Sequence, residues 1–277
     1  MLRPRIAILT YAALPDLFLE EQASTPALAA AGVDYFERIA ELKAWLDRVE
    51  ASGIPLVNSA SLVRWNLDKV YLLELAARGV KIIPTLHFKG GPSQNLTELL
   101  EQAGWDRAVI KPAISGCAFR TYVVDRGTAA VHQAEAQALQ ASVGLLVQPF
   151  LPEIGRVGEH SLIFFNGVFS HAVLKKPVPN EFRVQIQFGG TASGISPTPK
   201  MIQSAERVLA ALPEAPLYAR VDGVVLGEEL HLMEVELIEP YLYLDAAPGS
   251  AATYVATLAR TAYAMGARFQ KRNETGS

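Results

Sequence analysis

The first 80 residues alternate between short apolar runs and longer segments with helical periodicity. RIAILTY, residues 5–11, predicts a buried strand, and residues 35–53 predict an amphipathic helix that stops at a glycine. A second strand at residues 54–58 and a helix ending at Gly79 follow. This order predicts an α/β layer. Two strands are few for a parallel sheet, so either the layer is unusually small or a segment near residues 31–35 is absent.

Short strands separated by turn residues dominate the chain from Val80 onward. Asn166-Gly167 lies between two apolar runs and predicts a tight hairpin. Helices are expected near residues 128–142, 198–212 and 250–268, and strands at residues 80–88, 107–113, 120–124, 144–151, 161–175, 181–188 and 219–240. This second part therefore has an α+β pattern with antiparallel sheets.

Composition narrows the class of protein. The chain has 277 residues, of which 50% are hydrophobic, and a net charge of −3. It can bury one large core or two to three smaller ones. Without a basic footprint we expect no nucleic-acid partner, and without an apolar run of ~18 residues we expect no membrane span. The single cysteine, Cys117, excludes an intrachain disulfide and fits a reducing cytoplasm.

Two apolar strands near the C-terminus carry charged residues where a core needs aliphatic ones. In ARVDGVVLGEELHLMEVELIEP, residues 219–240, a three-residue turn places Asp222 opposite Glu234. The same register places Arg220 opposite Glu236, so all four side chains share one face. Three buried carboxylates repel one another unless a cation compensates them, and oxygen ligands suit Mg²⁺. The alternative is a solvated sheet face with Arg220 as an ion-pair partner.

Two lysines and a loop of small residues could meet an anion. Lys111 ends the apolar strand AVIK, and Lys69 falls on the apolar stripe of a predicted helix. A lysine on such a stripe either extends its ammonium to water or pairs with an anion, and the first option suits Lys69 taken alone. The loop at residues 112–121, with Ser115 and Gly116, could close over phosphates through its N–H groups. An ordinary hairpin loop fits it equally well.

A break in an apolar strand could provide a contact for a flat base. The strand LLVQPFL breaks at Gln148 and Pro149, and such a break between two sub-domains can expose backbone groups. Glu153 and Glu159 follow and could hold ribose hydroxyls, although a plain linker with solvated acids also fits. Further on, NEFRVQIQFGG, residues 180–190, has polar side chains on one strand face, either exposed or toward a ligand.

The order of these signals resembles the ATP-grasp superfamily over residues 58–244. The most specific part is R-V-D…L-M-E-V-E, which is similar to the Arg-x-Asp…Glu-x-Asn motif of D-alanine and glutathione-synthetase-like ligases. NLDK, VIKP and FFNGVFSHAVLK are closest to the branch of D-cycloserine-forming and ribosomal-protein glutamate ligases. The resemblance implies an α/β plus α+β chain with the ATP-grasp fold. Two α+β sub-domains, residues 61–148 and 149–277, would clasp ATP after a short Rossmann-like layer, residues 1–60.

The resemblance also implies a role for each matching position. Mg²⁺, with Mn²⁺ as a second candidate, would be held by the three acids Asp222, Glu234 and Glu236. Arg220 would stabilise the oxyanion that develops in the reaction, and Arg183 would sit near the γ-phosphate. The remaining positions would bind ATP: Lys69, Lys111, Ser115, Gly116 and Gln185 at the phosphates, Gln148, Pro149, Phe150 and Leu151 at the adenine, and Glu153 or, by spacing, Glu159 at the ribose.

The activity implied is that of an ATP-dependent carboxylate–amine ligase. A carboxylate would attack the γ-phosphate, and an amine would then displace phosphate from the acyl phosphate. The expected partners are small-molecule carboxylate and amine substrates of amino-acid type, in antibiotic or peptide-like metabolite biosynthesis, and a homodimer is left open. The alternatives are a protein-modifying amino-acid ligase, a nucleotide-binding relative without catalysis, and a metal-dependent hydrolase.

Two positions depart from the family pattern. Glu236 stands where many relatives have Asn, which adds a charge to the expected metal site. The segment LIEPYLYLD replaces a small-Pro-Gly loop, so Glu239, Tyr241 and Tyr243 could shape a distinct substrate pocket.

Overall fold

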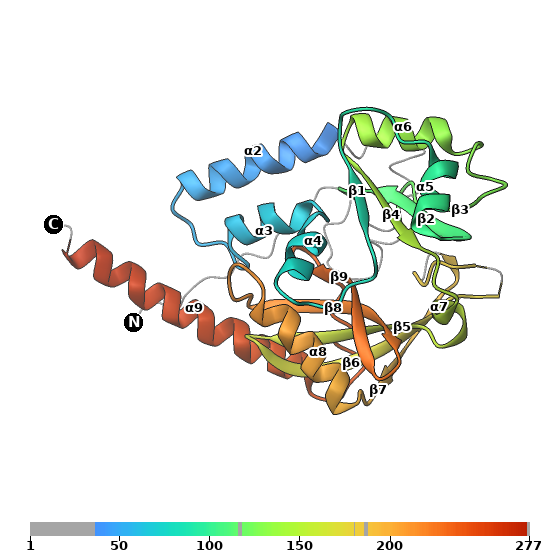
Figure 1. The fold of residues 1–277 in the computed structure, drawn as a ribbon. Helices are drawn as coiled ribbons and strands as arrows, with labels where there is room; N and C mark the ends of the chain where they lie inside the picture. The colour runs from blue at the N-terminus through green and yellow to red at the C-terminus, as the bar shows by residue number, and fades with distance from the viewer. Residues whose placement is uncertain (1–36, 116–117, 180, 186–187, 276–277) are drawn as a thin grey trace.

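The computed structural model describes residues 37–275 with gaps at 116–117, 180 and 186–187. The strand predicted at residues 5–11 and the loop residue Gly116 lie outside this part. Within the described residues, strands form one four-stranded and one five-stranded sheet, and helices pack on both (Figure 1). All strand pairs in these sheets are antiparallel. The predicted α+β character of the chain after Val80 is therefore confirmed.

The helices before the first sheet differ from the prediction in one respect. Helix α2 (Glu37–Ala51) is the amphipathic helix expected there. The strand predicted at residues 54–58 is wrong, because this segment is irregular and the Asn58 amide donates to the carbonyl oxygens of Tyr218 and Leu237. The single helix predicted next is divided into α3 (Ala60–Leu67) and α4 (Tyr71–Ala77).

Lys69 consequently lies between two helices rather than on a helical stripe. Its backbone N–H donates to Ala113 O over 2.8 Å instead of to a helical carbonyl. The preceding residue, Asp68, has extended angles of φ −103° and ψ 113°, which end α3. A contact with a distant strand thus overrides the local helical pattern at this point.

The smaller sheet has the strand order β1-β4-β2-β3. Its strands are β1 (Leu86–Phe88), β2 (Arg107–Pro112), β3 (Tyr122–Asp125) and β4 (Leu145–Pro149). Helices α5 (Leu96–Ala103) and α6 (Gln133–Ala141) supply core residues to one face, together with Ala108 and Ile110 of β2. Because side chains alternate along a strand, Lys111 lies on the other face of this sheet.

The larger sheet has the order β7-β6-β5-β8-β9. The short helix α7 (Pro152–Arg156) precedes it, and its strands are β5 (Glu159–Phe165), β6 (Val168–Lys176), β7 (Thr191–Ile195), β8 (Tyr218–Leu226) and β9 (Glu229–Glu236). Helix α8 (Pro199–Ala210) packs on one face against Leu162 and Val221. The long helix α9 (Ser250–Thr275) begins against Ile163 and Phe165 of the other face and extends away from the body (Figure 1).

Two predictions about the strands of this sheet have opposite outcomes. The Asn166-Gly167 hairpin is confirmed, with φ angles of 51° and 76° at the two turn residues and Phe165 paired with Val168. The strand predicted at residues 181–188 is wrong, because its described residues, 181–185 and 188, are irregular and β7 forms the sheet edge instead.

The hairpin of β8 and β9 has the predicted register but not the predicted turn. Asp222 pairs with Glu234 and Arg220 with Glu236, as expected. Leu226 pairs with Glu229, so the turn has two residues rather than three. A bulge next to Asp222 adds the missing residue on β9 and restores the register.

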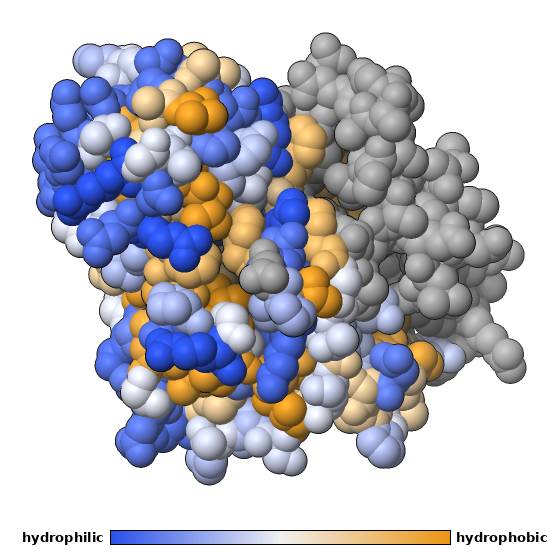
Figure 2. Space-filling model, turned by 90° about the vertical axis from the view of Figure 1, so that its right-hand side faces the viewer, coloured by the Kyte–Doolittle hydropathy of each residue, from blue (hydrophilic) through white to orange (hydrophobic). Residues whose placement is uncertain are grey.

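The surface shows how the polar and apolar residues are distributed. On the face in Figure 2, hydrophobic residues lie between polar groups above and below them. No helix in the described part of the chain is both long enough and apolar enough to cross a membrane. The chain passes from the smaller sheet to the larger one between Pro149, the end of β4, and Glu159, the start of β5. The sub-domain limits 61–148 and 149–277 stay a prediction.

Candidate functional site

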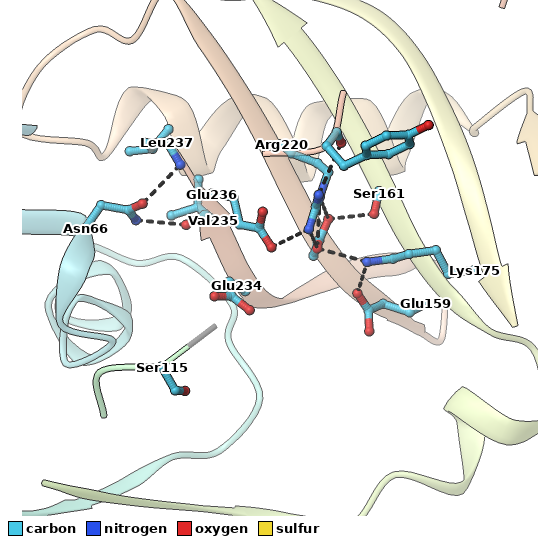
Figure 3. Close-up of polar contacts among 12 residues, drawn as sticks. Asn66, Ser115, Glu159, Ser161, Lys175, Arg220, Glu234, Val235, Glu236 and Leu237 are labelled. Carbon is cyan, nitrogen blue, oxygen red and sulfur yellow. Dashed lines mark hydrogen bonds and ion pairs between the residues drawn. The ribbon is translucent and has the colours of Figure 1, made fainter. Parts of the chain in front are cut away.

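A row of alternating charges crosses one face of the larger sheet. Lys175 on β6 lies opposite Glu159 on β5, and Ser161 on β5 lies opposite Asp222 on β8. Asp222 and Arg220 in turn lie opposite Glu234 and Glu236 of β9. Figure 3 shows Glu236, Arg220, Ser161, Lys175 and Glu159 as one row, with Glu234 and Ser115 beside it. The predicted set Arg220, Asp222, Glu234 and Glu236 is thus brought together on one face.

Asp222 is fully engaged by protein partners. Its Oδ1 accepts from Ser161 Oγ at 2.6 Å, and its Oδ2 accepts from Lys175 Nζ and Arg220 NH2 at 2.9 Å. Only 2% of the residue is exposed. Burial raises the pKa of this carboxyl, but Arg220 and Lys175 outweigh burial and hold its pKa well below the usual range. Asp222 is therefore an anion whose acceptor positions are occupied.

Glu234 belongs to a second ion pair, with Lys69. Lys69 is buried, and its Nζ pairs with Glu234 Oε1 and donates to Ser115 O at 2.8 Å. Burial lowers the pKa of Lys69, but the Glu234 carboxylate, with Glu236 and Glu239, raises it above its ordinary value. The side chain of Glu234 is 30% exposed. Lys69 therefore joins the larger sheet to the loop that follows β2.

Glu236 pairs with Arg220 and has an unusual acidity. Arg220 NH2 donates to Glu236 Oε1, and Arg220 NH1 donates to Tyr241 O at 3.1 Å. Burial and the neighbouring Glu234 carboxylate raise the pKa of Glu236 to about 8, although Arg220 acts in the opposite direction. A carboxyl with a raised pKa on a face with other carboxylates is one that a further cation would stabilise.

Lys111 faces this region from the smaller sheet. Its ammonium forms no hydrogen bond and no ion pair with any residue that the structure describes. Burial and the charge of Lys69 together lower its pKa to about 8, although Glu234 acts in the opposite direction. A half-buried ammonium without a partner is costly, so the arrangement favours an anion next to it.

The expected adenine hinge is at the end of β4. Gln148 is 5% exposed and donates from Nε2 to Thr85 Oγ1 at 2.9 Å. Phe150 donates its backbone N–H to Arg107 O, so that group is occupied, and the Arg107 guanidinium lies 4.0 Å from the centre of the Phe150 ring. Pro149 ends the strand and Leu151 precedes α7. Their adenine role stays a prediction.

The two acids considered for the ribose have different surroundings. Glu153 in α7 pairs with Arg156 at 2.8 Å, one helical turn away. Glu159 is 8% exposed and pairs with Lys175. Glu159 is therefore part of the charged row of the larger sheet, whereas Glu153 is closer in sequence to the end of β4. Neither ribose role is tested by these contacts.

Arg183 and Gln185 lie in the irregular segment after β6. Arg183 forms a two-point pair with Glu181, with NE–Oε1 at 3.0 Å and NH2–Oε2 at 2.7 Å. Its guanidinium stacks 3.6 Å from the centre of the Phe188 ring. The Oε1 atom of Gln185 is buried without a hydrogen bond. The Arg183 side chain is thus held by contacts within its own segment.

Lys175 is the main site residue that the sequence analysis missed. Counting from the Asn166-Gly167 turn pairs Glu159 with Leu174, which hides the lysine. A bulge between Ile163 and Phe164 shifts the register by one residue, so that Glu159 pairs with Lys175 instead. Ser161 was also missed, because a serine in an apolar strand carries no charge signal.

The fit of a metal ion can be judged from the free carboxylate oxygens. In the residues that the structure describes, Glu234 and Glu236 each use only Oε1 in a contact. Their Oε2 atoms are of the ligand type that Mg²⁺ prefers, because it is a hard cation that binds oxygen. No group of three or more His, Cys, Asp or Glu side chains in the described part of the chain is arranged to hold a metal. Glu234 and Glu236 would each offer one free oxygen to an ion, and Asp222 would have to exchange a partner to join them.

Comparison with known proteins identifies relatives. No family model matches the chain. The cycloserine biosynthesis protein DcsG of Streptomyces lavendulae is 33% identical over 143 residues, which are 50% of this chain and 48% of DcsG. A probable α-L-glutamate ligase of Marinobacter nauticus is 30% identical over 164 residues, 58% of this chain and 52% of that protein. The matches thus span about half the length of these curated relatives.

Solved structures of ligases have a similar fold. The crystal structure of the D-cycloserine synthetase DcsG superposes with a TM-score of 0.73 at 28% identity, over 82% of this chain and 80% of that one. The D-alanine–D-alanine ligase of Bacillus anthracis in complex with ATP has a TM-score of 0.61 at 17% identity, over 82% and 75% of the two chains. The chain is therefore a homologue of ATP-grasp ligases and has their fold.

Proposed function

We propose that this protein is an ATP-dependent ligase that joins an amino-acid-like carboxylate to an amine through an acyl phosphate. The observation that carries the proposal is the unpartnered Lys111, which faces the charged row beside Lys69 and Glu234. Cations from the smaller sheet and free carboxylate oxygens from the larger one together match a metal-bound polyphosphate. Sequence similarity to DcsG and to a probable α-L-glutamate ligase supports a ligase reaction.

The protein groups divide the chemistry between them. Lys111 and Lys69 would neutralise the phosphates of ATP, and Ser115 begins the loop that would cover them. Glu234 and Glu236 would hold Mg²⁺, with Mn²⁺ as a second candidate, and Asp222 would join after exchanging one partner. A bound divalent ion neutralises charge on the transferring phosphoryl group. Positioning and charge compensation are the main needs of this chemistry, so no protein nucleophile is required.

Arg220 would stabilise the oxyanion that develops on the substrate carboxylate. Its guanidinium is fixed by Asp222, Glu236 and Tyr241 O, so its donors are oriented before a substrate arrives. Such preorganised donors stabilise a developing oxyanion. Arg183 would turn from Glu181 to the γ-phosphate, with Gln185 beside it. This turn would break the ion pair with Glu181, which is the only one that Arg183 forms in the described part of the chain.

The substrate pocket is proposed at the end of the charged row near the C-terminal segment. Tyr241 and Tyr243 stack edge to face, with ring centres 4.7 Å apart, and the Arg220 guanidinium lies 5.9 Å from the centre of the Tyr243 ring. The aromatic rings and Arg220 suit an amino-acid-like molecule better than an extended protein chain. Antibiotic or peptide-like metabolite biosynthesis, a cytoplasmic location and a homodimer are parts of the same proposal.

Release of ADP in the presence of pooled carboxylates tests this function. Purified protein is incubated with Mg²⁺, ATP, amino acids and hydroxy acids, and ADP is measured with and without an amine pool. We expect ADP release that requires both Mg²⁺ and a carboxylate. Lys111→Met and Glu234→Gln should abolish it, and Lys176→Met, an exposed lysine next to the charged row, should not. A rise in melting temperature with nucleotide but no turnover would instead indicate a binding protein without catalysis.

A further inference from the structure

The outer edge of β9 is bonded to the backbone of residues 81–83 at Leu232, and to side chains further along, at Val235 and just beyond the strand at Leu237. β9 is the last strand of the larger sheet, and its edge would otherwise expose backbone groups. Tyr71 OH donates to Val235 O at 3.1 Å and accepts from Val235 N at 3.0 Å. Asn66 donates to Val235 O at 2.8 Å and accepts from Leu237 N at 3.0 Å. The backbone groups bonded to these two side chains are those of the residues on either side of Glu236.

The residues that bind this edge also flank Lys69 in sequence. Asn66 is near the end of α3 and Tyr71 begins α4, and both are buried, at 8% and 1% exposure. Between them, Lys69 donates its N–H to Ala113 O and its ammonium to Ser115 O and Glu234. The junction of α3 and α4 therefore has one set of contacts to β9 and another to the loop after β2.

Fixing a functional contact requires support from neighbouring rigid groups. The Lys69–Glu234 pair links a buried lysine to a glutamate whose side chain is 30% exposed, and a partly exposed pair keeps its geometry best with rigid support. The bonds from Asn66 and Tyr71 hold the backbone that carries Glu234 and Glu236. A contact network of this kind determines where the free carboxylate oxygens lie relative to the loop after β2.

We propose that Asn66 and Tyr71 are positioning residues, which hold the α3–α4 junction on the edge of β9 and thereby set Lys69 and Glu234 in register for the metal-bound phosphates. This inference rests on the proposed function. The alternative is that the two side chains only protect a sheet edge. In that case their loss would lower stability without changing the affinity for Mg²⁺ and nucleotide.

The test uses Tyr71→Phe, which removes both hydroxyl bonds and keeps the buried ring. We measure the dissociation constant of a non-hydrolysable ATP analogue with Mg²⁺ by titration calorimetry. We expect it to rise about tenfold, the equivalent of losing about one net hydrogen bond. Amide exchange at Val235 should accelerate in the same variant without any ligand. Val208→Ala is the matched control, because it weakens the same core cluster without removing a hydrogen bond.

A double-mutant cycle decides whether Tyr71 acts through Glu234. In the Glu234→Gln background, Tyr71→Phe should change the dissociation constant by less than twofold, because the group it positions is gone. Asn66→Ala provides a second variant with the same expected pattern if Tyr71→Phe does not fold. An unchanged dissociation constant in folded Tyr71→Phe, or an additive effect in the cycle, would overturn the inference. Wild-type protein that binds no Mg²⁺–nucleotide would instead overturn the proposed function.

Discussion

The residues of the charged row fall into two groups according to what their oxygens contact. Asp222 is surrounded by Arg220, Lys175 and Ser161, whereas Glu234 and Glu236 each keep one oxygen free of contacts within the described residues. The first arrangement is fixed by the protein alone, and under the proposed function the second would be completed by an added cation. The same chemical group is thus fully paired in one position and keeps a free oxygen in the other two.

Loss of Lys175 should destabilise the protein strongly. Lys175→Met leaves the buried Glu159 and Asp222 without their shared cation, so the free energy of unfolding should fall by about 3–5 kcal/mol. Chemical denaturation at pH 7 measures it. Lys176→Met removes the neighbouring exposed lysine and should change stability by less than about 0.5 kcal/mol. Equal effects of the two substitutions would show that the buried pairs contribute no more than surface ones.

Nucleotide binding should weaken as the pH rises through the pKa of Lys111. This pKa is lowered to about 8, so the free protein loses the ammonium charge above that pH. A phosphate binds the charged form, and binding must then take up a proton. Between pH 8 and 9 the affinity should fall by up to about tenfold relative to Lys111→Arg, whose charge does not titrate there. Parallel pH profiles for both proteins would contradict the assignment.

Among the elements, the bulges decide which charges meet. The pairs of Asp222 with Glu234 and Arg220 with Glu236 were predictable, because a bulge on β9 offsets the shorter turn. The Glu159–Lys175 pair was not predictable, because the bulge on β6 has no compensating change in the turn. Turn residues are visible in a sequence, whereas a bulge depends on packing across the whole sheet. Sequence reasoning therefore found the charged residues of β8 and β9 and also Glu159, but it missed Lys175 and Ser161.

Gly223 next to the β9 bulge should tolerate no side chain. A Cβ atom there would lie 2.5 Å from His231 O, closer than any stable contact. Gly223→Ala should therefore lower the free energy of unfolding by about 1–3 kcal/mol and reduce Mg²⁺–nucleotide affinity, since Glu234 follows the bulge. Denaturation and titration calorimetry measure the two effects. Gly155→Ala, where a Cβ has open space, is the control. No change at Gly223 would mean that the bulge adapts freely.

At the scale of the whole molecule, Lys69 links the larger sheet to the loop that follows β2 of the smaller one. The antiparallel character of these two sheets was predictable from the strand pattern. The antiparallel α+β arrangement followed from short strands and turn residues, and the order of motifs pointed to the ATP-grasp fold. The division of one predicted helix into α3 and α4 was not visible, because it depends on the contact of Lys69 with Ala113. Local periodicity cannot report a contact that is 44 residues away in sequence.

Ligand binding between the sheets should stabilise the whole molecule. With Mg²⁺–ADP at about 100 times its dissociation constant, the free energy of unfolding should rise by about 2.7 kcal/mol by mass action. Thermal melting in the presence of Mg²⁺–ADP should then show one transition shifted upward. In Glu234→Gln, removal of Mg²⁺ with EDTA should make little difference. A full Mg²⁺-dependent shift in that variant would show that the metal binds elsewhere.

Trapping of the acyl phosphate is the most direct test of the proposed ligase reaction. Wild-type protein is incubated with Mg²⁺, ATP, the carboxylate pool and hydroxylamine, which converts an acyl phosphate to a hydroxamate. We expect hydroxamate in an amount equal to the ADP released by the wild-type protein, and none with Glu234→Gln. ATP hydrolysis that is independent of every carboxylate, or ADP release without hydroxamate, would contradict the proposed reaction.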